Sequence, residues 1–219
     1  MSAAMTKPVL WSFRRCPYAM RARLAVAASG VAVELREILL RDKPAAFIAA
    51  SSKATVPVLC NTDGTVIDES RDIMFWALGQ NDPDNWLACW QADKAAVEAF
   101  LDRLDGPFKT HLDRYKYASR YVGEGDTDHR SAGAAFLGEV NDKLSVQPAL
   151  SGAELGLMDF ASLPFIRQFR IADVEWFDAQ PWPHLHAWLD GFLTSDRFAN
   201  IMTKYTPWLE GETGIAFNG

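Results

Sequence analysis

Cys16 is the residue whose type and position most directly suggest chemistry in this sequence. It lies in the stretch WSFRRCPYAMRARLAV, between Arg15 and Pro17, where a short hydrophobic run meets a pattern typical of a helix. A thiolate at the start of a helix gains hydrogen bonds and electrostatic support from unpaired backbone N–H groups, and such positions lower cysteine pKa values. Arg14 and Arg15 could add positive potential or point into water. We therefore predict that Cys16 is a reactive thiol rather than a small buried apolar residue.

The residues after Cys16 indicate how such a thiol would work. Ala19 occupies the position at which a dithiol oxidoreductase carries its second cysteine, so no disulfide can form within this turn. A thiolate that attacked a disulfide here would remain in a mixed disulfide until an external thiol released it. The other two cysteines, Cys60 and Cys89, are more consistent with packing, and their reactivity stays open. The expected co-substrate is an abundant small thiol.

The elements that must position Cys16 alternate between strand and helix over the first eighty residues. Pro17 suits the first position of a helix, Gly30 suits its end, and the turn residues Asp63 and Gly64 separate two apolar runs as in a hairpin. The order is therefore βαβαββα, an α/β domain over residues 1–80. The predicted elements are strand 8–13, helix 17–30, strand 31–38, helix 43–51, strands 56–60 and 65–69, and helix 70–80.

A polar stretch separates this part from a differently patterned second half. NDPDNW at 81–86 contains Pro83 and is typical of a linker. Beyond it strand signals are sparse and helical spacing recurs, for example in LMDFASLPFIRQFRIA at 157–172. We predict an all-α domain over residues 87–219.

Composition limits the classes of partner. The chain has 219 residues, 49% of them hydrophobic, a formal charge of -6 and a pI near 5.2. An acidic chain is poorly suited to nucleic acid or to anionic membranes, because both are bound mainly through basic surface. We find no apolar segment of membrane-spanning length and expect a cytoplasmic protein with free thiols. His184 and His186 form a pair that no cysteine or carboxylate cluster completes, so no metal site is predicted.

Four short motifs, taken in order, resemble cytosolic glutathione transferases, most closely the omega-type, cysteine-dependent members. They are Cys-Pro-Tyr-Ala from Cys16, DKPAAF with Lys43, TVPVL with Val56 and Pro57, and the pair ES at 69–70. The resemblance covers nearly the whole chain. It implies a thioredoxin-like N-terminal domain followed by a helical domain, with glutathione as co-substrate and a homodimer as the assembly.

The resemblance also implies roles for the residues of these motifs. Val56, before a cis Pro57, would offer its backbone N–H and C=O to the extended glutathione peptide. Ser70, at a helix start, would bind the γ-glutamyl carboxylate, and Glu69 would face the α-ammonium of the same group. Lys43 would meet the glycyl carboxylate. The alternatives are an ordinary trans turn at Pro57, a plain helix cap at 69–70 and a solvated lysine.

The second half adds structural matches to the same family. Asp159 falls where the family has a helix-capping aspartate, while Gly156 replaces the usual Ser or Thr and would lose the side-chain hydrogen bond of that cap. Phe108, Tyr115 and Trp208 fall where the family lines its pocket for the second substrate. Aromatic residues at helical spacing are also typical of a core.

These observations lead to one main hypothesis and two alternatives. We expect a glutathione-dependent thiol transferase in which Cys16 forms a mixed disulfide that glutathione resolves. The resemblance to omega-type proteins also implies reduction of dehydroascorbate or removal of glutathione from S-glutathionyl adducts, and the sequence does not choose among these tasks. One alternative is conjugation of glutathione to electrophiles, which in the family typically uses a Ser or Tyr hydroxyl. The other is a non-enzymatic protein that uses the same fold to bind glutathione or a partner protein.

Overall fold

The computed structural model describes residues 6–121, 123, 125 and 127–218. The chain divides into two units. Unit 1 consists of Met1–Asp84 together with Asp196–Gly219, and unit 2 consists of Asn85–Ser195. The C-terminal residues therefore group with the first part of the chain, whereas the sequence pattern placed all residues after 86 in the helical part.

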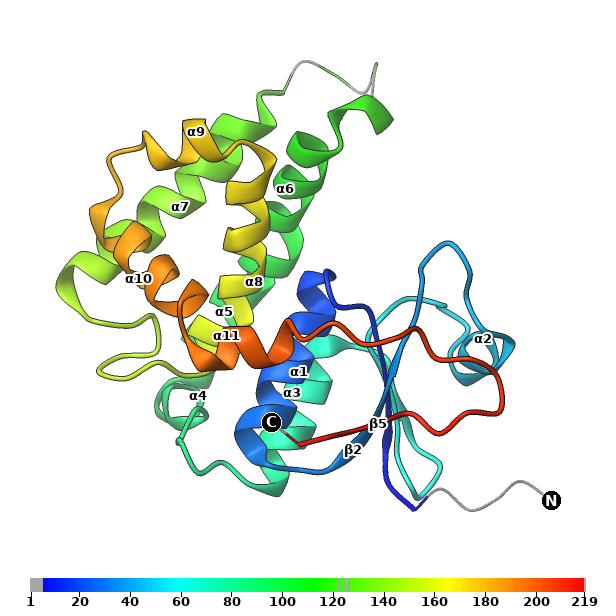
Figure 1. Ribbon diagram of the computed structural model, residues 1–219. Helices are drawn as coiled ribbons and strands as arrows, with labels where there is room; N and C mark the ends of the chain where they lie inside the picture. Colours follow the sequence, from blue (N-terminus) through cyan, green and yellow to red (C-terminus); the bar gives the residue numbers. More distant parts are fainter. Residues whose placement is uncertain (1–5, 122, 124, 126, 219) are drawn as a thin grey trace. The chain divides into compact units, whose positions relative to one another are not determined.

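Unit 1 is built around a mixed five-stranded sheet with the order β4-β3-β1-β2-β5. β1 pairs in parallel with β2, and the remaining neighbours are antiparallel. Figure 1 shows α1 and α3 side by side in this unit, and the two helices contact each other. The predicted βαβαββα order is confirmed. Its elements are β1 Val9–Ser12, α1 Pro17–Ser29, β2 Val33–Glu37, α2 Ala45–Ala50, β3 Val58–Cys60, β4 Val66–Ile67 and α3 Ser70–Gln80.

Helix α1 begins and ends at the residues that its sequence suggests. Pro17 occupies its first turn, and Gly30 follows its last residue with φ 69°, the left-handed conformation that favours glycine. The Gly30 N–H donates to the carbonyl of Ala27. Most of the helix is buried, including Arg21 and Arg23, which are 2% and 1% exposed. α1 therefore has no broad polar face, which is unusual for a helix that carries charged residues.

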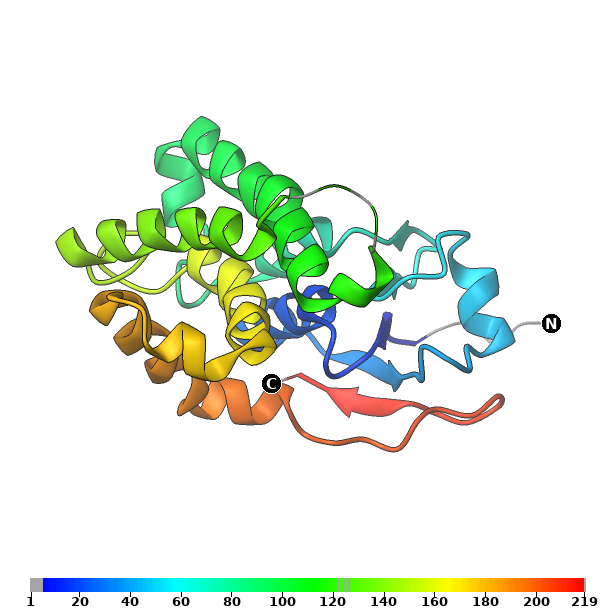
Figure 2. The same cartoon turned by 90° about the horizontal axis from the view of Figure 1, so that it is seen from above.

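The C-terminal segment completes unit 1. After α11 (Asp196–Ile201) the chain places Trp208 in the core, with its ring edge-on to Trp11 and the two centroids 5.1 Å apart. Strand β5 (Ile215–Phe217) then pairs with β2, as Figure 2 shows. This strand covers an edge of the sheet and differs from the helical prediction for this region.

Unit 2 is helical. The predicted helix over 157–172 coincides with α8. The stretch LACWQADKAAVEAFLDRL at 87–104 also has helical spacing, but it forms two helices. They are divided at Asp93, whose side chain accepts a hydrogen bond from the N–H of Ala96 and so begins the second helix. A π-helical turn at Leu104–Phe108 accommodates Pro107. The other elements are α4 Ala88–Ala92, α5 Lys94–Arg103, α6 Lys109–Lys116, the 3-10 turn Ala118–Arg120, α7 His129–Val146, α8 Leu157–Ala172, α9 Val174–Asp178 and α10 Pro183–Leu193.

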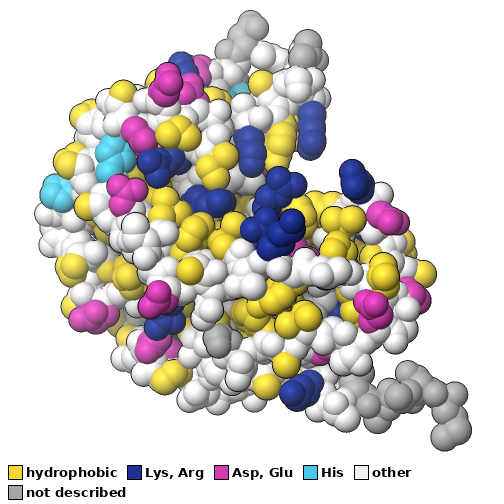
Figure 3. Space-filling view, in the orientation of Figure 1, with side chains coloured by type: hydrophobic (Ala, Val, Ile, Leu, Met, Phe, Trp, Pro, Cys, Tyr) yellow, Lys and Arg dark blue, Asp and Glu magenta, His cyan; other side chains and the backbone are white. Residues whose placement is uncertain are grey.

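The surface carries charges of both signs. On the face drawn in Figure 3, acidic, basic and hydrophobic side chains are interspersed. None of the helices in the described part of the chain combines the length and the hydrophobicity that crossing a bilayer requires. The predicted fold class is confirmed: a mixed sheet with helices, followed by a helical part.

Candidate active site

Cys16 lies at the N-cap position of α1, as predicted. Its backbone is extended (φ -77°, ψ 123°), its N–H donates to the carbonyl of Phe13, and its own carbonyl accepts from the N–H of Met20. Pro17 supplies the first helical residue and lacks the N–H that would otherwise need a partner there. The sulfur is thus held at the positive end of a 13-residue helix.

The surroundings of the Cys16 side chain combine a hydrophobic core with a backbone carbonyl. Cys16 is half-buried and packs against the cluster that contains Trp11, Ala19 and Val58. Its Sγ lies 3.7 Å from the carbonyl oxygen of Val56. The thiol therefore lies where the start of α1 faces the segment that precedes β3.

The two arginines before Cys16 have different environments. Arg14 donates from Nη1 to the carbonyl of Met202, at 3.1 Å, so its side chain is tied to the C-terminal segment. Arg15 is exposed, and its guanidinium carbon lies 5.5 Å from the centre of the Phe13 ring. Exposed Arg15 fits the alternative of a side chain that points into water, whereas half-buried Arg14 is held by a backbone carbonyl.

A buried arginine that the sequence analysis did not select lies behind the same loop. Arg23 donates to the Ser12 hydroxyl at 2.7 Å and to the Arg14 carbonyl at 2.8 Å, and its Nη1 lies 3.7 Å from a Glu37 oxygen. The other Glu37 oxygen accepts the N–H of Arg14 at 2.6 Å. Arg23 and Glu37 together therefore fix the backbone that leads from β1 to Cys16.

Burial shifts the pKa of both members of this pair. Loss of solvation lowers the pKa of Arg23 to about 10, with the Glu37 charge opposing the shift, so the guanidinium stays protonated at neutral pH. Burial also raises the pKa of the Glu37 carboxyl, against the hydrogen bond from Arg14 and the charge of Arg23. Both shifts favour the uncharged forms of Arg23 and Glu37. Burying this ion pair therefore costs free energy.

The peptide bond between Val56 and Pro57 is cis, as expected from the resemblance. Val56 is 7% exposed, and its carbonyl is the oxygen that faces the Cys16 thiol. In the part of the chain that the structure describes, no acceptor takes the Val56 N–H. The backbone next to Cys16 thus offers a donor to an extended peptide.

Glu69 and Ser70 begin α3, as predicted, but they differ in exposure. Glu69 is the N-cap residue; its carbonyl accepts from Ile73, while its side chain makes no capping hydrogen bond and is 64% exposed. Ser70 is 3% exposed. Lys53 lies with Nζ 2.5 Å from a Glu69 oxygen and 3.0 Å from Asp68. The Lys53 ammonium group therefore already contacts the Glu69 carboxylate, which the resemblance predicts to face the α-ammonium of glutathione.

Ser70 is also in contact with a buried charge. Nε of Arg21, on α1, donates to its hydroxyl oxygen at 3.0 Å. This contact joins the helix that begins after Cys16 to the helix that begins at Ser70. The sequence gives one signal for such buried arginines: Arg21 and Arg23 are surrounded by Ala, Met and Leu, with no polar stripe beside them.

Lys43 stands apart from these contacts. It is half-buried and precedes Pro44, the N-cap residue of α2. The structure brings Cys16 and Val56 together and joins α1 to the Glu69–Ser70 pair. It gives Lys43 no comparable contact with them.

The three residues predicted to line a second-substrate pocket have different environments. Phe108 is 1% exposed and stacks on Phe136 and Phe169 in the core of unit 2. Trp208 is 8% exposed and belongs to the core of unit 1. The position of Phe108 supports the packing interpretation, whereas Trp208 also lines a hollow of about 210 Å³ in unit 1. Tyr115 lines a hollow of about 360 Å³ in unit 2.

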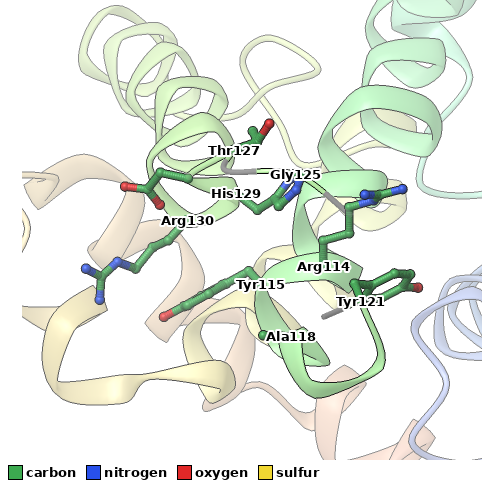
Figure 4. Close-up of a pocket in the computed structure, with 9 residues that line it drawn as sticks. Arg114, Tyr115, Ala118, Tyr121, Gly125, Thr127, His129 and Arg130 are labelled. Atoms are coloured by element: carbon green, nitrogen blue, oxygen red, sulfur yellow. The ribbon is translucent and has the colours of Figure 1, made fainter. Parts of the chain in front are cut away.

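This hollow is lined by basic and aromatic side chains. Figure 4 shows Arg114 and Tyr115 from α6 opposite His129 and Arg130 at the start of α7. His129 lies with Nδ1 2.9 Å from Nδ1 of His111. Burial, then the neighbouring His129 and Arg114, lower the pKa of His111 and so favour its neutral imidazole.

The remaining cysteines are placed for packing. Cys16, Cys60 and Cys89 all lie in the described part of the chain, and none of them forms a disulfide. Burial raises the pKa of Cys60, and the Cys89 Sγ lies 3.7 Å from the carbonyl of Trp86. Among the described residues, no group of three or more His, Cys, Asp or Glu side chains is arranged to hold a metal ion.

The first part of the chain is similar to known sequences. Residues 10–86 match the family described as "Glutathione S-transferase, N-terminal domain". The chain is 39% identical over 61 residues to glutathione S-transferase omega-1 of Rattus norvegicus, a match that covers 28% of this chain and 25% of the relative. It is 40% identical over 55 residues to a probable glutathione transferase of Aplysia californica, covering 25% of this chain and 60% of that protein. The chain thus spans a quarter to 60% of the length of these relatives.

Solved structures match over most of the chain. A glutathione transferase family member from Pseudomonas fluorescens with two glutathione bound has a TM-score of 0.76 at 15% identity, covering 90% of this chain and 92% of that one. Glutathione transferase Omega 3C from Trametes versicolor has a TM-score of 0.74 at 20% identity, covering 93% and 92%. Residues 10–86 are therefore similar to glutathione S-transferase N-terminal domains, and the chain has the glutathione S-transferase fold.

Proposed function

We propose that this protein is a glutathione-dependent thiol transferase of the omega type, with Cys16 as the nucleophile. The observation that carries the proposal is the position of the Cys16 sulfur, at the N-cap of α1 and 3.7 Å from the carbonyl of Val56 in a cis Val56–Pro57 segment. A hydroxyl at this position could only polarise bound glutathione, whereas a thiolate can attack a disulfide.

The reaction takes place in two exchanges. The Cys16 thiolate attacks one sulfur of a substrate disulfide; a bond forms between Cys16 and that sulfur, the substrate S–S bond breaks, and the other sulfur leaves as a thiolate that takes up a proton. Glutathione thiolate then attacks the mixed disulfide and releases Cys16. When the substrate is a glutathionyl adduct, the products are the free substrate thiol and oxidised glutathione. The incoming glutathione thiolate supplies the electron pair of the new S–S bond, and Cys16 leaves as a thiolate, so the enzyme is unchanged.

The residues around Cys16 would bind and orient glutathione. The free N–H of Val56 suits the peptide backbone of an extended ligand. The start of α3 offers Ser70 to the γ-glutamyl carboxylate, and Glu69 suits the α-ammonium in place of Lys53, because an ion pair between two exposed side chains is weak. Lys43 would contact the glycyl carboxylate. One structural neighbour is described as having two glutathione molecules bound, which supports glutathione as the ligand.

Two of the three residues predicted to contact the second substrate line hollows. Tyr115 lines the hollow in unit 2, beside the cations Arg114 and Arg130, and Trp208 lines a separate hollow in unit 1. We therefore include in the proposal a small disulfide or electrophile as substrate. A homodimer and a cytoplasmic location, where glutathione keeps thiols reduced, belong to the same proposal.

The test compares the wild type with Cys16→Ser in glutathione-dependent reduction of a small mixed disulfide, with intact masses recorded after exposure to oxidised glutathione. We expect turnover and one bound glutathione in the wild type, and at least a hundredfold loss of turnover with no adduct in Cys16→Ser. Cys60→Ser and Cys89→Ser are matched controls that should keep both properties.

Three other outcomes would each lead to a different conclusion. A Cys16→Ser variant that lost disulfide reduction and gained conjugation would still support Cys16 as the nucleophile. Glutathione binding without turnover in the wild type would instead favour a binding protein on this fold. A folded wild type with neither turnover nor adduct would show that the thiol is inert.

A further inference from the structure

We propose that Arg14 is a positioning residue through which the C-terminal segment, residues 202–217, holds Cys16 at the start of α1. This inference rests on the proposed function and concerns how its nucleophile is placed. Arg14 is half-buried, and its Nη1 donates to the carbonyl oxygen of Met202 at 3.1 Å. The two residues are 188 positions apart in the sequence, and both belong to unit 1.

The backbone of Arg14 is fixed on both sides, which leaves its side chain to connect the loop with the C-terminal segment. The N–H of Arg14 donates to a Glu37 oxygen at 2.6 Å, and its carbonyl accepts from Nη2 of Arg23 at 2.8 Å. Cys16 follows two residues later, and its N–H donates to the carbonyl of Phe13 at 3.0 Å, which closes the turn between them. A displacement of Arg14 would therefore also move Cys16.

Met202 offers its carbonyl to Arg14 because it lies just past the end of α11. The N–H of Met202 donates to the carbonyl of Phe198 at 3.1 Å, so the residue extends the hydrogen bonding of that helix by one position. The last carbonyl groups of a helix have no partner within the helix. The Arg14 guanidinium supplies such a partner, and a hydrogen bond from a charged donor is stronger than one between neutral groups.

The middle of the C-terminal segment is fixed to the strands on either side of this loop. The N–H of Trp208 donates to the carbonyl of Glu37 at 2.8 Å, and its ring lies edge-on to Trp11. The guanidinium carbon of Arg36 lies 4.5 Å from the centre of the Trp208 ring and 4.9 Å from that of Trp11. These contacts join the segment to both β1 and β2, so it is a rigid support for Arg14.

The far end of the segment depends on a glycine. The N–H of Gly214 donates to a Glu34 oxygen at 2.9 Å, next to the pairing of β5 with β2. A Cβ at Gly214 would lie 2.6 Å from the carbonyl oxygen of Leu35, which is closer than real Cβ contacts allow. A substitution here would therefore loosen the segment without touching Arg14 or Cys16.

The charges around Arg23 show why the placement of Cys16 matters for its chemistry. Burial lowers the pKa of Arg23 to about 10, and the charges of Glu37, of a Cys16 thiolate and of Tyr205 oppose this shift. Such interactions are mutual, so the guanidinium favours the thiolate form of Cys16. Tyr205 belongs to the C-terminal segment. The distance of Cys16 from Arg23 and from the start of α1 thus determines how much thiolate is present at neutral pH.

The experiment measures the rate at which iodoacetamide alkylates Cys16 as a function of pH, with the Cys16 peptide quantified by mass spectrometry so that the other cysteines do not contribute. The midpoint of the profile reports thiolate formation, and the plateau at high pH reports access to the sulfur. Loss of one hydrogen bond changes an equilibrium by about two- to tenfold. Arg14→Met should therefore reduce the thiolate fraction at neutral pH about fivefold, which raises the midpoint by about 0.7 pH units.

Further variants separate positioning from a loss of charge. Arg15→Met removes the exposed arginine beside Cys16 and is the matched control, with a midpoint shift of less than about 0.2 pH units. Arg14→Lys keeps a charged donor and should show less than half of the shift of Arg14→Met. Gly214→Ala changes no charge and should reduce the thiolate fraction about twofold. Gly79→Ala, at a glycine with open space around its Cβ position, should leave the profile unchanged.

Two results would overturn the inference. Equal midpoints for Arg14→Met and Arg15→Met would mean that the side-chain contact with Met202 has no part in placing Cys16. A wild-type profile for Gly214→Ala would mean the same of the C-terminal segment, and this variant decides the question even if Arg14→Met does not fold. Failure of the proposed function is a separate result: a wild type without disulfide reduction, combined with the expected shifts, would remove the function and keep the positioning of Cys16.

Discussion

Glu37 in unit 1 and Asp159 in unit 2 are both buried carboxylates, but their partners differ. Asp159 is 0% exposed and accepts four hydrogen bonds from neutral donors: the backbone N–H groups of Leu150, Ser151 and Gly156, and the indole N–H of Trp188. Glu37 accepts the N–H of Arg14 with one oxygen. Its other oxygen lies 3.7 Å from Arg23 and makes no hydrogen bond within the described residues.

This difference shows two uses of a buried charge. Four donors from three segments of unit 2 converge on Asp159, so its charge is solvated by the protein and ties those segments together. Glu37 and Arg23 are an ion pair that is costly to bury, and such pairs add little net stability. What they hold is the loop of residues 12–14 that leads into Cys16. We infer that the first carboxylate serves stability and the second serves the site.

The largest expected effect tests the first half of this comparison. Asp159→Asn keeps the size of the side chain but replaces one acceptor oxygen by an amide that faces N–H donors, so we expect a loss of about 3 kcal/mol in the free energy of unfolding. Urea unfolding followed by circular dichroism and tryptophan fluorescence measures it. Asp142→Asn, at an exposed position of α7, is the control and should stay within about 0.5 kcal/mol of the wild type. Equal effects of the two variants would show that Asp159 is not a structural centre.

A smaller effect concerns the cap of the same helix. Gly156 has no side chain to cap α8, but the Ser151 hydroxyl accepts the N–H of Met158 at 3.1 Å and supplies the missing bond. The expected loss of a side-chain cap at Gly156 is therefore confirmed, and the Ser151 hydroxyl replaces it. A Cβ at Gly156 would lie 3.0 Å from the Cβ of Ser151, so the glycine makes room for this substitute cap.

Ser151→Ala should therefore destabilise unit 2 by about 1 kcal/mol, the usual cost of losing a helix N-cap. Its backbone N–H still reaches Asp159, so the variant isolates the cap from the carboxylate network. Urea unfolding gives the value, and Ser145→Ala, at an exposed serine of α7, is the matched control. A loss as large as that of Asp159→Asn would mean that cap and network act as one unit.

The sequence predicted the parts of the molecule that local chemistry determines. Pro17 and Gly30 mark α1 because one fixes φ and the other adopts positive φ, and Cys16 follows as the N-cap. Periodicity gave the order of strands and helices in unit 1 and the bounds of α8. Each of these features depends on neighbours in the chain.

The parts that the sequence did not predict depend on contacts between distant residues. Strand β5 is three residues long, and its pairing with β2 is set by the path of the chain after Trp208. Arg21 and Arg23 are charged residues on a helix, which ordinarily indicates a solvated face. Their burial follows from Ser70 and Glu37, and neither partner is near them in sequence.

The smallest expected effect tests the second half of the comparison. Burial raises the pKa of Glu37 above its ordinary value of 4.5, so the folded protein binds this proton more tightly than the unfolded chain does. The stability contributed by the protonated form is complete below pH 4.5 and is lost as the pH rises through the folded pKa. Glu37→Gln resembles the protonated form at every pH. Because the raised pKa means that the ionised carboxylate is less favourable in the folded protein than the protonated one, Glu37→Gln should increase the free energy of unfolding at neutral pH, by less than about 1 kcal/mol.

The pH dependence gives the sharper measurement, because other titrating groups cancel between two variants. Urea unfolding of the wild type and of Glu37→Gln at pH 4 and at pH 7 should show Glu37→Gln gaining stability relative to the wild type at the higher pH. The opposite sign would mean that the ionised carboxylate stabilises the fold through Arg23, and Glu37 would then belong with Asp159 as a structural residue. With the expected sign, the pair is retained at a cost in stability, and the remaining reason for it is the loop that places Cys16.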